Sequence, residues 1–245
     1  APSPSSSLPR RGADTLEAGT FTSTLDGGID GDSLDGSGAA DSLVGDDGID
    51  TLEGEGGGDT LSAGNDADSI IGDAGADSVL AGAGNDSIDL DATPGGGADD
   101  DDDTLAGGTG IDTLFQFDGL GSVAYSFDDS KFAGAGTDEI NSIERVSLST
   151  GVGADSLDAS GFSGSVTLAA GDGDNTLIGG VAADSLSGNF GLNRVLAGGN
   201  TNHTLTSGQL TSGIVTDTLS GIDEVSITGG ASANSIAASG FAGSV

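Results

Sequence analysis

One aliphatic residue recurs every nine positions through the first half of the chain, each time preceded by a hydroxyl residue. The consecutive pairs are Thr15-Leu16, Thr24-Leu25, Ser33-Leu34, Ser42-Leu43, Thr51-Leu52, Thr60-Leu61, Ser69-Ile70, Ser78-Val79 and Ser87-Ile88. An amphipathic helix needs about three apolar residues in seven, so this pattern is too sparse for a helix. It favours short strands of about three residues, each with a single inward side chain.

Glycine-rich segments separate these short strands, and glycine permits the positive φ angles that tight bends need. A strand of about three residues is not stable alone, so the segments must stack on copies of themselves. Two nine-residue units per turn would give two facing ladders of strands, with Leu, Ile and Val filling a thin core and successive turns about 4.8 Å apart. The pattern therefore predicts an all-β solenoid over residues 12–115.

An acidic residue precedes most of the hydroxyl–aliphatic pairs. On the nine-residue grid these residues are Asp14, Asp32, Asp41, Asp50, Asp59, Asp68, Asp77 and Asp86. Only Ser23 breaks the series, and the grid slips by one residue within 93–103 before it resumes at Asp103 and Asp112. Stacked turns would bring the carboxylates into rows, in which each adjacent pair costs roughly 1 kcal/mol at about 4 Å even in water. A thin aliphatic core cannot offset that repulsion together with the loss of backbone entropy.

The rows of carboxylates therefore need a cation. Residues 12–115 contain 26 acidic residues and no Lys or Arg, so a metal ion is the remaining candidate. Carboxylates and loop carbonyls are hard oxygen donors, which suit Ca²⁺ better than Zn²⁺ or Cu²⁺. The chain has no Cys, which excludes thiolate sites. Its net charge of −35 argues against nucleic acid and anionic membrane surfaces as partners, and no apolar run approaches the roughly 20 residues that span a bilayer.

The repeat resembles that of the RTX (repeats-in-toxin) family, whose unit reads Gly-Gly-x-Gly-x-Asp-x-aliphatic-x. Residues 107–115, with the sequence GGTGIDTLF, match every position, and residues 27–35 match all but one. The resemblance implies a right-handed parallel β-roll, in which several Ca²⁺ ions lie between the loops of adjacent turns. The sixth-position Asp and loop carbonyls would be the ligands.

Carried over residue by residue, the resemblance gives the ligands as Asp32, Asp41, Asp50, Asp59, Asp68, Asp77, Asp86, Asp103 and Asp112, with Asp14 at the frayed start. Ser23 leaves the site of the first turn in question. The run of acids at 99–103 is either a solvated loop or an extra site of calcium capture. A disordered acidic segment is the alternative interpretation of the whole region, and it is also the expected state of the calcium-free chain.

The aromatic residues concentrate between Phe115 and Phe132. Within this stretch, residues 122–127 alternate like an ordinary strand. We expect an insertion over residues 116–136, either bulged out of the roll or packed on it as a plug. A ligand-binding aromatic patch is the alternative.

A longer repeat follows, because residues 137–166 align with residues 216–245. The hydroxyl–aliphatic pairs persist, but the acid position keeps only Asp155 and Asp184. Elsewhere that position holds Gly164, Asn175, Asn193 and Asn234. Asn side chains can stack in amide ladders without charge. We therefore expect residues 137–245 to form a β-solenoid of two longer repeats that is largely metal-poor, with Asp155 and Asp184 as its candidate ligands.

No combination of residues indicates catalysis. The tetrapeptide GDSL at 31–34 spells an esterase motif, but it falls on the repeat grid and needs no catalytic explanation. The single histidine, His203, has no Asp three residues before it. We expect His203 in a surface loop rather than as a ligand, and we expect the chain not to be an enzyme.

The longer repeats resemble those of large secreted bacterial calcium-binding proteins. Together with the RTX resemblance, this implies a secreted calcium-binding structural protein, such as a surface-layer, sheath, filament or adhesin scaffold on a bacterial cell. Calcium outside the cell would order the chain turn by turn, and low calcium inside would leave it unfolded. The alternatives are the calcium-folding module of a secreted hydrolase or toxin whose active domain lies elsewhere, and calcium buffering or mineral templating. Residues 1–11 are expected to be a flexible linker or tail. The chain stops at Val245 in mid-unit, so we expect either that it is part of a longer solenoid or that another chain continues the stack there, as in end-to-end assembly of copies.

Overall fold

The computed structural model describes residues 11–89, 101–134, 136–238 and 241–245. These residues form strands and turns without a helix, and they divide into two compact units. Of the described residues, the first unit takes in 11–89, 101–115 and 136–143, and the second takes in the rest. The tail expected at residues 1–11 lies outside the described residues except for Arg11, as do Asp99 and Asp100 of the acidic run.

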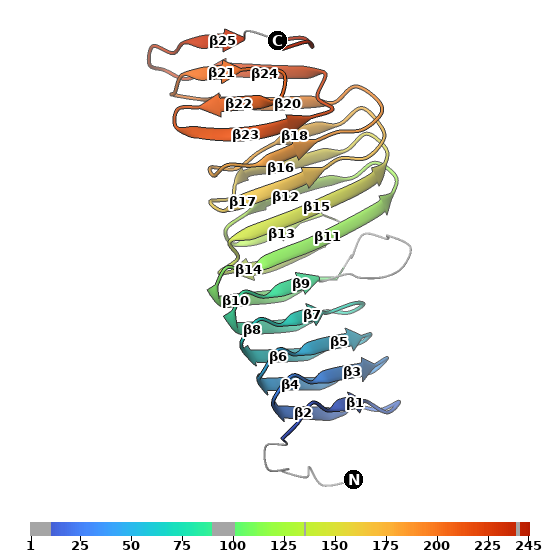
Figure 1. Ribbon diagram of the computed structural model, residues 1–245. Helices are drawn as coiled ribbons and strands as arrows, with labels where there is room; N and C mark the ends of the chain where they lie inside the picture. Colours follow the sequence, from blue (N-terminus) through green and yellow to red (C-terminus); the bar gives the residue numbers. More distant parts are fainter. Residues whose placement is uncertain (1–10, 90–100, 135, 239–240) are drawn as a thin grey trace. The chain divides into compact units, whose positions relative to one another are not determined.

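The first unit consists of short strands separated by loops. They are β1 (Thr15–Glu17), β2 (Thr24–Ile29), β3 (Ser33–Ser37), β4 (Ser42–Asp47), β5 (Thr51–Glu55), β6 (Thr60–Asn65), β7 (Ser69–Ile71), β8 (Ser78–Gly84), β9 (Ser87–Asp89), β10 (Thr104–Gly110), the start of β11 (Thr113–Leu120), and β14 (Thr137–Asn141). Odd-numbered strands follow one another in one parallel sheet as far as β11, and even-numbered strands do so in another (Figure 1).

The pairing register confirms two nine-residue units per turn. Leu16 pairs with Leu34 and Leu34 with Leu52 in one sheet, and Leu43 pairs with Leu61 in the other. Each of these steps is 18 residues, and between β8 and β10, where Val79 pairs with Leu105, the step is 26. This regularity places identical grid positions directly above one another, so every inward aliphatic residue stacks on the next. The predicted all-β parallel roll is confirmed.

The core of the first unit is narrow and well filled. Leu43, Leu52 and Leu61 have no measurable exposure, and the residue two positions further along is Gly or Ala, as in Ala63. A larger residue does not fit there. At Gly54 a Cβ atom would lie 2.6 Å from the Gly72 carbonyl oxygen and 2.8 Å from Asp59 Oδ2. Glycine therefore lets each loop approach the acid of its own repeat.

The second unit also consists of strands, some of them longer. They are the end of β11, β12 (Ala124–Asp128), β13 (Lys131–Ala133), β15 (Arg145–Val152), β16 (Ser156–Gly161), β17 (Ser165–Ala169), β18 (Thr176–Ile178), β19 (Ser185–Ser187), β20 (Arg194–Gly199), β21 (His203–Leu205), β22 (Gln209–Ser212), β23 (Val215–Ser220), β24 (Glu224–Gly229) and β25 (Ile236–Ala238). One sheet contains the order β15-β17-β19-β23-β22-β21-β25 and the other β13-β12-β16-β18-β20-β24. The order is parallel except at β12–β13 and along β21–β22–β23.

The aromatic stretch belongs to the sheets of the second unit. Strand β12 pairs in parallel with β16, with a shift of register between Ser126 and Asp128, and β13 folds back against β12. Phe132 is buried, and its ring centroid lies 5.3 Å from that of Tyr125 and 5.4 Å from that of Phe127. The insertion expected from the sequence thus corresponds to an antiparallel hairpin whose aromatic rings fill the core.

Candidate metal centre

The grid aspartates lie at the ends of the loops, immediately before the hydroxyl–aliphatic pair that opens each strand. Asp32, Asp41, Asp50, Asp59, Asp68, Asp77, Asp86, Asp103, Asp112, Asp155 and Asp184 are all buried, with at most 4% exposure. Asp14, at the start of the series, is half-buried. Carboxylates this deeply buried need compensation for the water they lose. The structure therefore places the predicted ligands in an environment where their charge has to be met.

One carboxylate oxygen of each aspartate is held by the main chain of the preceding turn. Asp50 Oδ1 accepts a hydrogen bond of 2.7 Å from the Asp32 N–H, and Asp68 Oδ1 accepts one of 2.8 Å from the Asp50 N–H. Asp59 Oδ1 accepts one of 2.7 Å from the Asp41 N–H. Each acid therefore orients the next one through the backbone, and all carboxylates of a row have the same orientation.

At the break in the grid, Ser23 keeps only the main-chain part of this arrangement. Its N–H donates to Asp41 Oδ1 at 2.5 Å, while its hydroxyl donates to the Phe21 carbonyl oxygen at 2.7 Å. Ser23 supplies no carboxylate to the row.

The second carboxylate oxygen is the distinctive atom of the row. In Asp32, Asp50, Asp59, Asp68 and Asp86 the Oδ2 atom is buried and has no hydrogen-bond donor among the described residues. A buried charged oxygen without a partner is costly. In the region that the structure describes, no three acidic or histidine side chains gather around one point. A bound cation would therefore depend on main-chain carbonyls as well as on these carboxylates.

The second unit shows what surrounds this position. Asn175 occupies the acid position, and its Oδ1 accepts from the Asp155 N–H at 2.9 Å, as a grid aspartate does. Its Nδ2 takes the place of Oδ2 and donates to the carbonyls of Gly171 and Gly173, at 3.1 and 3.2 Å, and to Asn193 Oδ1 at 2.8 Å. The expected stacking of amides is present in one step, from Asn175 to Asn193, whereas Asn234 donates to the Thr201 carbonyl. Here a hydrogen-bond donor faces loop carbonyls, so an aspartate in that place would set oxygen against oxygen.

This comparison explains why a cation fits the carboxylate rows. A carboxylate oxygen directed at loop carbonyls makes a site of oxygen donors alone, negatively charged and free of nitrogen or sulfur. Such a donor set suits Ca²⁺. Asp32, Asp50, Asp59, Asp68 and Asp86 would hold the ion together with loop carbonyls, and the ion would supply the positive charge that the amide hydrogens supply at Asn175.

Three grid aspartates have protein donors in place of a cation. Asp155 Oδ2 accepts from the Thr150 hydroxyl at 2.7 Å, Asp184 Oδ2 accepts from the Gly180 N–H at 2.8 Å, and Asp41 Oδ2 accepts from the Ser37 hydroxyl at 2.8 Å. Sequence reasoning missed these donors. For Asp155 and Asp41 the available signal was a hydroxyl residue four or five positions before the acid, where the other grid aspartates have none, whereas the main-chain donor to Asp184 gives no such signal. Both candidate ligands of the second unit, Asp155 and Asp184, are among the three.

The hydroxyl at Thr150 allows a direct test. Replacing this buried residue by Val keeps its shape and leaves Asp155 Oδ2 without a donor, so we expect the second unit to lose about 2 kcal/mol of stability in EGTA. Thr167→Val, at an exposed position of β17, is the matched control and should change stability by no more than about 0.5 kcal/mol. Hydrogen exchange of residues 144–238 measures both. Equal effects of the two variants would contradict the assigned hydrogen bond.

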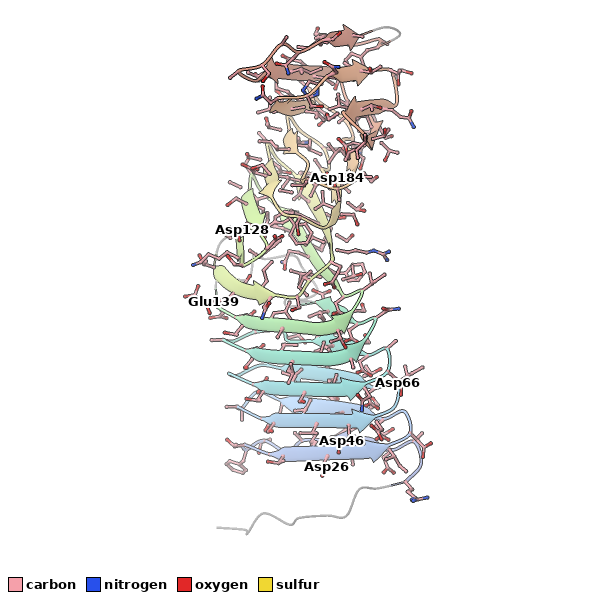
Figure 2. All side chains as sticks on the ribbon, turned by 90° about the vertical axis from the view of Figure 1, so that its left-hand side faces the viewer. Asp26, Asp46, Asp66, Asp128, Glu139 and Asp184 are labelled. Atoms are coloured by element: carbon pink, nitrogen blue, oxygen red, sulfur yellow. The ribbon has the colours of Figure 1, made fainter. Side chains whose placement is uncertain are left out.

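The loops carry a further layer of charge. Asp46 pairs in register with Gly28 and Gly64, which have φ angles of 108° and 118°, and Asp46 itself has a φ of 74°. A left-handed backbone costs a non-glycine residue roughly 1 kcal/mol. Burial, together with the charges of Asp26 and Asp47, raises the pKa of Asp46. Figure 2 shows Asp26, Asp46 and Asp66 in the strands and loops of the first unit.

Burial dominates the titration of the rows. It raises the pKa of Asp68 from 3.8 to about 7, and the charges of Asp50, Asp86 and Asp66 add to the shift. Burial likewise raises the pKa of Asp50, Asp59 and Asp86. These directions apply to the protein without metal. They mean that the folded row holds protons that the unfolded chain has already released.

Acid should therefore stabilise the calcium-free first unit. Between about pH 4 and pH 7 the folded state binds more protons than the unfolded state, so the free energy of unfolding falls as the pH rises through this window. We expect β-structure in EGTA to increase from about pH 7.5 to about pH 5, measured by circular dichroism. With calcium bound the trend should reverse, because protons compete with the ion. A calcium-free signal that decreases with acid would contradict the buried carboxylate rows.

His203 is not in a surface loop, so that expectation is wrong. It lies in β21 with 1% exposure, and its Nδ1 is 3.0 Å from the Ser212 hydroxyl. The antiparallel pairing of β21 with β22 sets the two side chains opposite each other. The sequence gave no sign that β21 pairs with β22, because residues 209–212 do not follow the nine-residue repeat.

Comparison with protein families agrees with the geometry. The model of the RTX calcium-binding nonapeptide repeat, four copies long, matches residues 10–43, 35–70, 53–88, 96–115, 160–195 and 169–202, which together exceed half of the chain. The comparison with curated proteins gives no match. In the part of the chain that the structure describes, no helix is long and apolar enough to cross a membrane.

Proposed function

Because the chain belongs to the family built from RTX calcium-binding nonapeptide repeats, we propose that this calcium-binding β-roll serves as a structural scaffold outside the cell. The observation that supports the proposal is that, within each unit, the residues at the acid position stack on one another from turn to turn. Carboxylates occupy the buried acid position in the first unit, and Asn175 and Asn193 occupy it in the second. A regular stack of strands that is held in two chemically different ways suits a load-bearing role.

Calcium would control where this scaffold forms. A chain with buried rows of unneutralised carboxylates has little reason to fold at the low calcium of a cell interior, and it gains stability where calcium is plentiful. Secretion before folding, with assembly at a bacterial cell surface, follows from that difference. The alternative, a calcium-folding module of a secreted hydrolase or toxin, would use the same carboxylate rows without self-association.

Exposed sheet edges supply a route to assembly. Among the described strands, β1 and β25 each have a neighbour on one side only, which leaves backbone groups available to a second copy. Electron microscopy and sedimentation of the 245-residue chain in millimolar calcium test the proposal. We expect end-to-end oligomers that dissociate in EGTA. Monomers at every protein concentration would instead favour the secreted-module alternative.

A further inference from the structure

The antiparallel part of the second unit turns polar side chains into the core. Strand β22 pairs with β21 on one side and β23 on the other, with His203 opposite Ser212 and Leu210 opposite Asp217. The neighbouring strands β17 and β19 have aliphatic residues at these inward positions, as in Leu168 and Leu186. The polar residues here lie where the strands of this sheet run antiparallel in the described chain.

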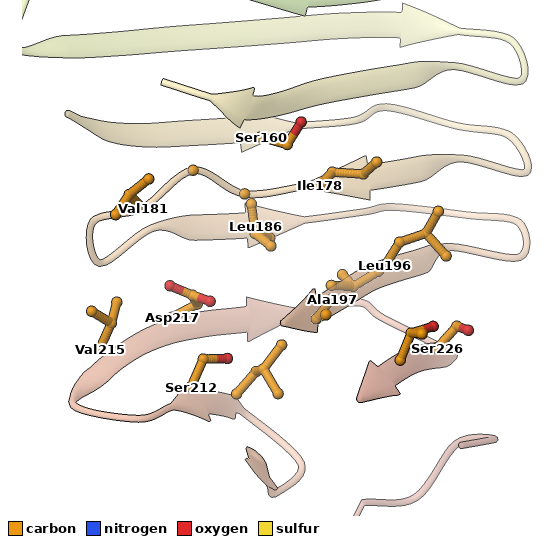
Figure 3. Close-up of a pocket in the computed structure, with 16 residues that line it drawn as sticks. Ser160, Ile178, Val181, Leu186, Leu196, Ala197, Ser212, Val215, Asp217 and Ser226 are labelled. Atoms are coloured by element: carbon orange, nitrogen blue, oxygen red, sulfur yellow. The ribbon is translucent and has the colours of Figure 1, made fainter. Parts of the chain in front are cut away.

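A cavity of about 600 Å³ lies next to these residues. Its lining includes Leu186, Val195, Ala197, Leu210, Ser212 and Asp217. Figure 3 shows Asp217 on β23 between Leu186 and Ser212 in the view, with Ala197 on another strand of the lining. The cavity reaches solvent, because Val181 also lines it and is 65% exposed.

The packing around Ala197 shows that this space is not ordinary core. Ala159 stands two residues after the inward Leu157 in β16 and is fully buried. Ala197 stands two residues after the inward Val195 in β20 but is only half-buried. The side chains around Ala197 therefore leave a space, whereas the side chains around Ala159 leave none. A volume of this size is within the range of small-molecule sites, roughly 300–1,000 Å³.

We propose that this cavity binds a small primary alkylammonium ion, with the charged head at Asp217 and the alkyl chain among the aliphatic side chains. One Asp217 oxygen already accepts from the Asp184 N–H at 3.1 Å, which fixes the carboxylate at the cavity wall. Ser212 supplies a second acceptor. Its oxygen keeps a lone pair whether the hydroxyl donates to His203 Nδ1 or accepts from it.

Charge excludes the other classes of amphiphile. An alkyl carboxylate would meet the Asp217 charge within a chain of net charge −35. A neutral alcohol would occupy the apolar volume and leave the carboxylate without a counter-charge. An ammonium group has a positive charge to meet the Asp217 carboxylate, and its three donors are enough for both Asp217 and the Ser212 oxygen. Asp217 stands before Thr218 and Leu219, at the acid position one turn after Asp184, so it belongs to the same row. The proposed ligand reaches it from the cavity beside that row, and the inference extends the proposed function without depending on it.

Titration calorimetry of the full chain in saturating calcium tests the proposal, with n-hexylammonium as the probe and 1-hexanol and hexanoate as comparisons. We expect one hexylammonium per chain, and a loss of about tenfold to a hundredfold in affinity in Asp217→Asn. Asp174→Asn removes one exposed carboxylate of the same unit outside the cavity lining, and it should bind hexylammonium like the wild type. Equal weakening in both variants would show adventitious binding to surface charge and overturn the proposal, as would equal affinity for hexanol.

A second variant separates binding from folding. Ala197→Phe fills the cavity and leaves Asp217 in place, so it should abolish hexylammonium binding while circular dichroism and Tm stay at wild-type values or rise. Hexylammonium binding by Ala197→Phe with wild-type affinity would place the ligand elsewhere and overturn the assignment. Absence of any hexylammonium binding to the folded wild-type chain would do the same.

Discussion

Removing calcium with EGTA is expected to unfold the first unit while the second keeps its β-structure. In the first unit the buried Oδ2 atoms of Asp32, Asp50 and Asp68 lack donors among the described residues, and each is a carboxylate in a row of like charges. Leaving a buried charge without its partner typically costs about 3–5 kcal/mol. A loss of that size at several turns exceeds the stability of about 5–15 kcal/mol that a domain has in total.

The second unit has no such dependence at the same position. Asn175 and Asn193 are neutral, and their amide groups satisfy the loop carbonyls. Asp155 and Asp184 have donors from Thr150 and Gly180. Calcium therefore has little to add to this part of the fold.

Hydrogen exchange read by mass spectrometry distinguishes the two units in one experiment. After EGTA treatment, peptides from residues 12–89 should exchange as an unfolded chain does, while peptides from residues 144–205 should stay protected. Magnesium should not restore protection, because it demands a smaller, near-octahedral site and dehydrates reluctantly. Equal protection of the two regions in EGTA would show that the carboxylate rows do not need the ion.

The parts of this fold that periodicity specifies were predictable from the sequence. The 18-residue register follows from a nine-residue repeat with one inward aliphatic residue, as the pairing of Leu16 with Leu34 and of Leu52 with Ile70 confirms. The burial of the grid acids follows too, because each lies two residues before an inward aliphatic residue and so shares its face of the chain. In a repeat protein the pairing of distant strands can be predicted from one repeat, since the same contacts recur one turn later.

Other features depend on contacts that no period encodes. The donors to Asp155 and Asp184 are the hydroxyl of Thr150, near the end of β15, and the main-chain N–H of Gly180 in a loop, and the nine-residue repeat specifies neither. The burial of His203 depends on the antiparallel return of β22, which brings Ser212 beside it. The sequence pattern locates the rows of acids. The local path of the chain determines whether an individual acid accepts a hydrogen bond from the protein or needs an ion.

Asn193→Asp is expected to make the second unit depend on calcium. Asn193 is fully buried, and its Nδ2 donates to the carbonyls of Asn189 and Gly221, at 2.9 and 3.1 Å. An aspartate keeps Oδ1 as the acceptor for Asn175 but sets Oδ2 against both carbonyls. In EGTA the variant should lose about 3 kcal/mol or more, since a buried charge is left without a donor.

Calcium should restore the lost stability, because the substitution recreates the donor set of the first unit. A rise in Tm with calcium in Asn193→Asp, and none in the wild-type second unit, is the decisive difference; exchange protection of residues 144–205 measures it locally. Asn200→Asp is the matched control, because Asn200 is exposed and its Oδ1 acceptor role toward the Ser232 N–H survives. If calcium fails to rescue Asn193→Asp, the loop carbonyls do not form a cation cradle, and the equivalence between amide group and ion is wrong.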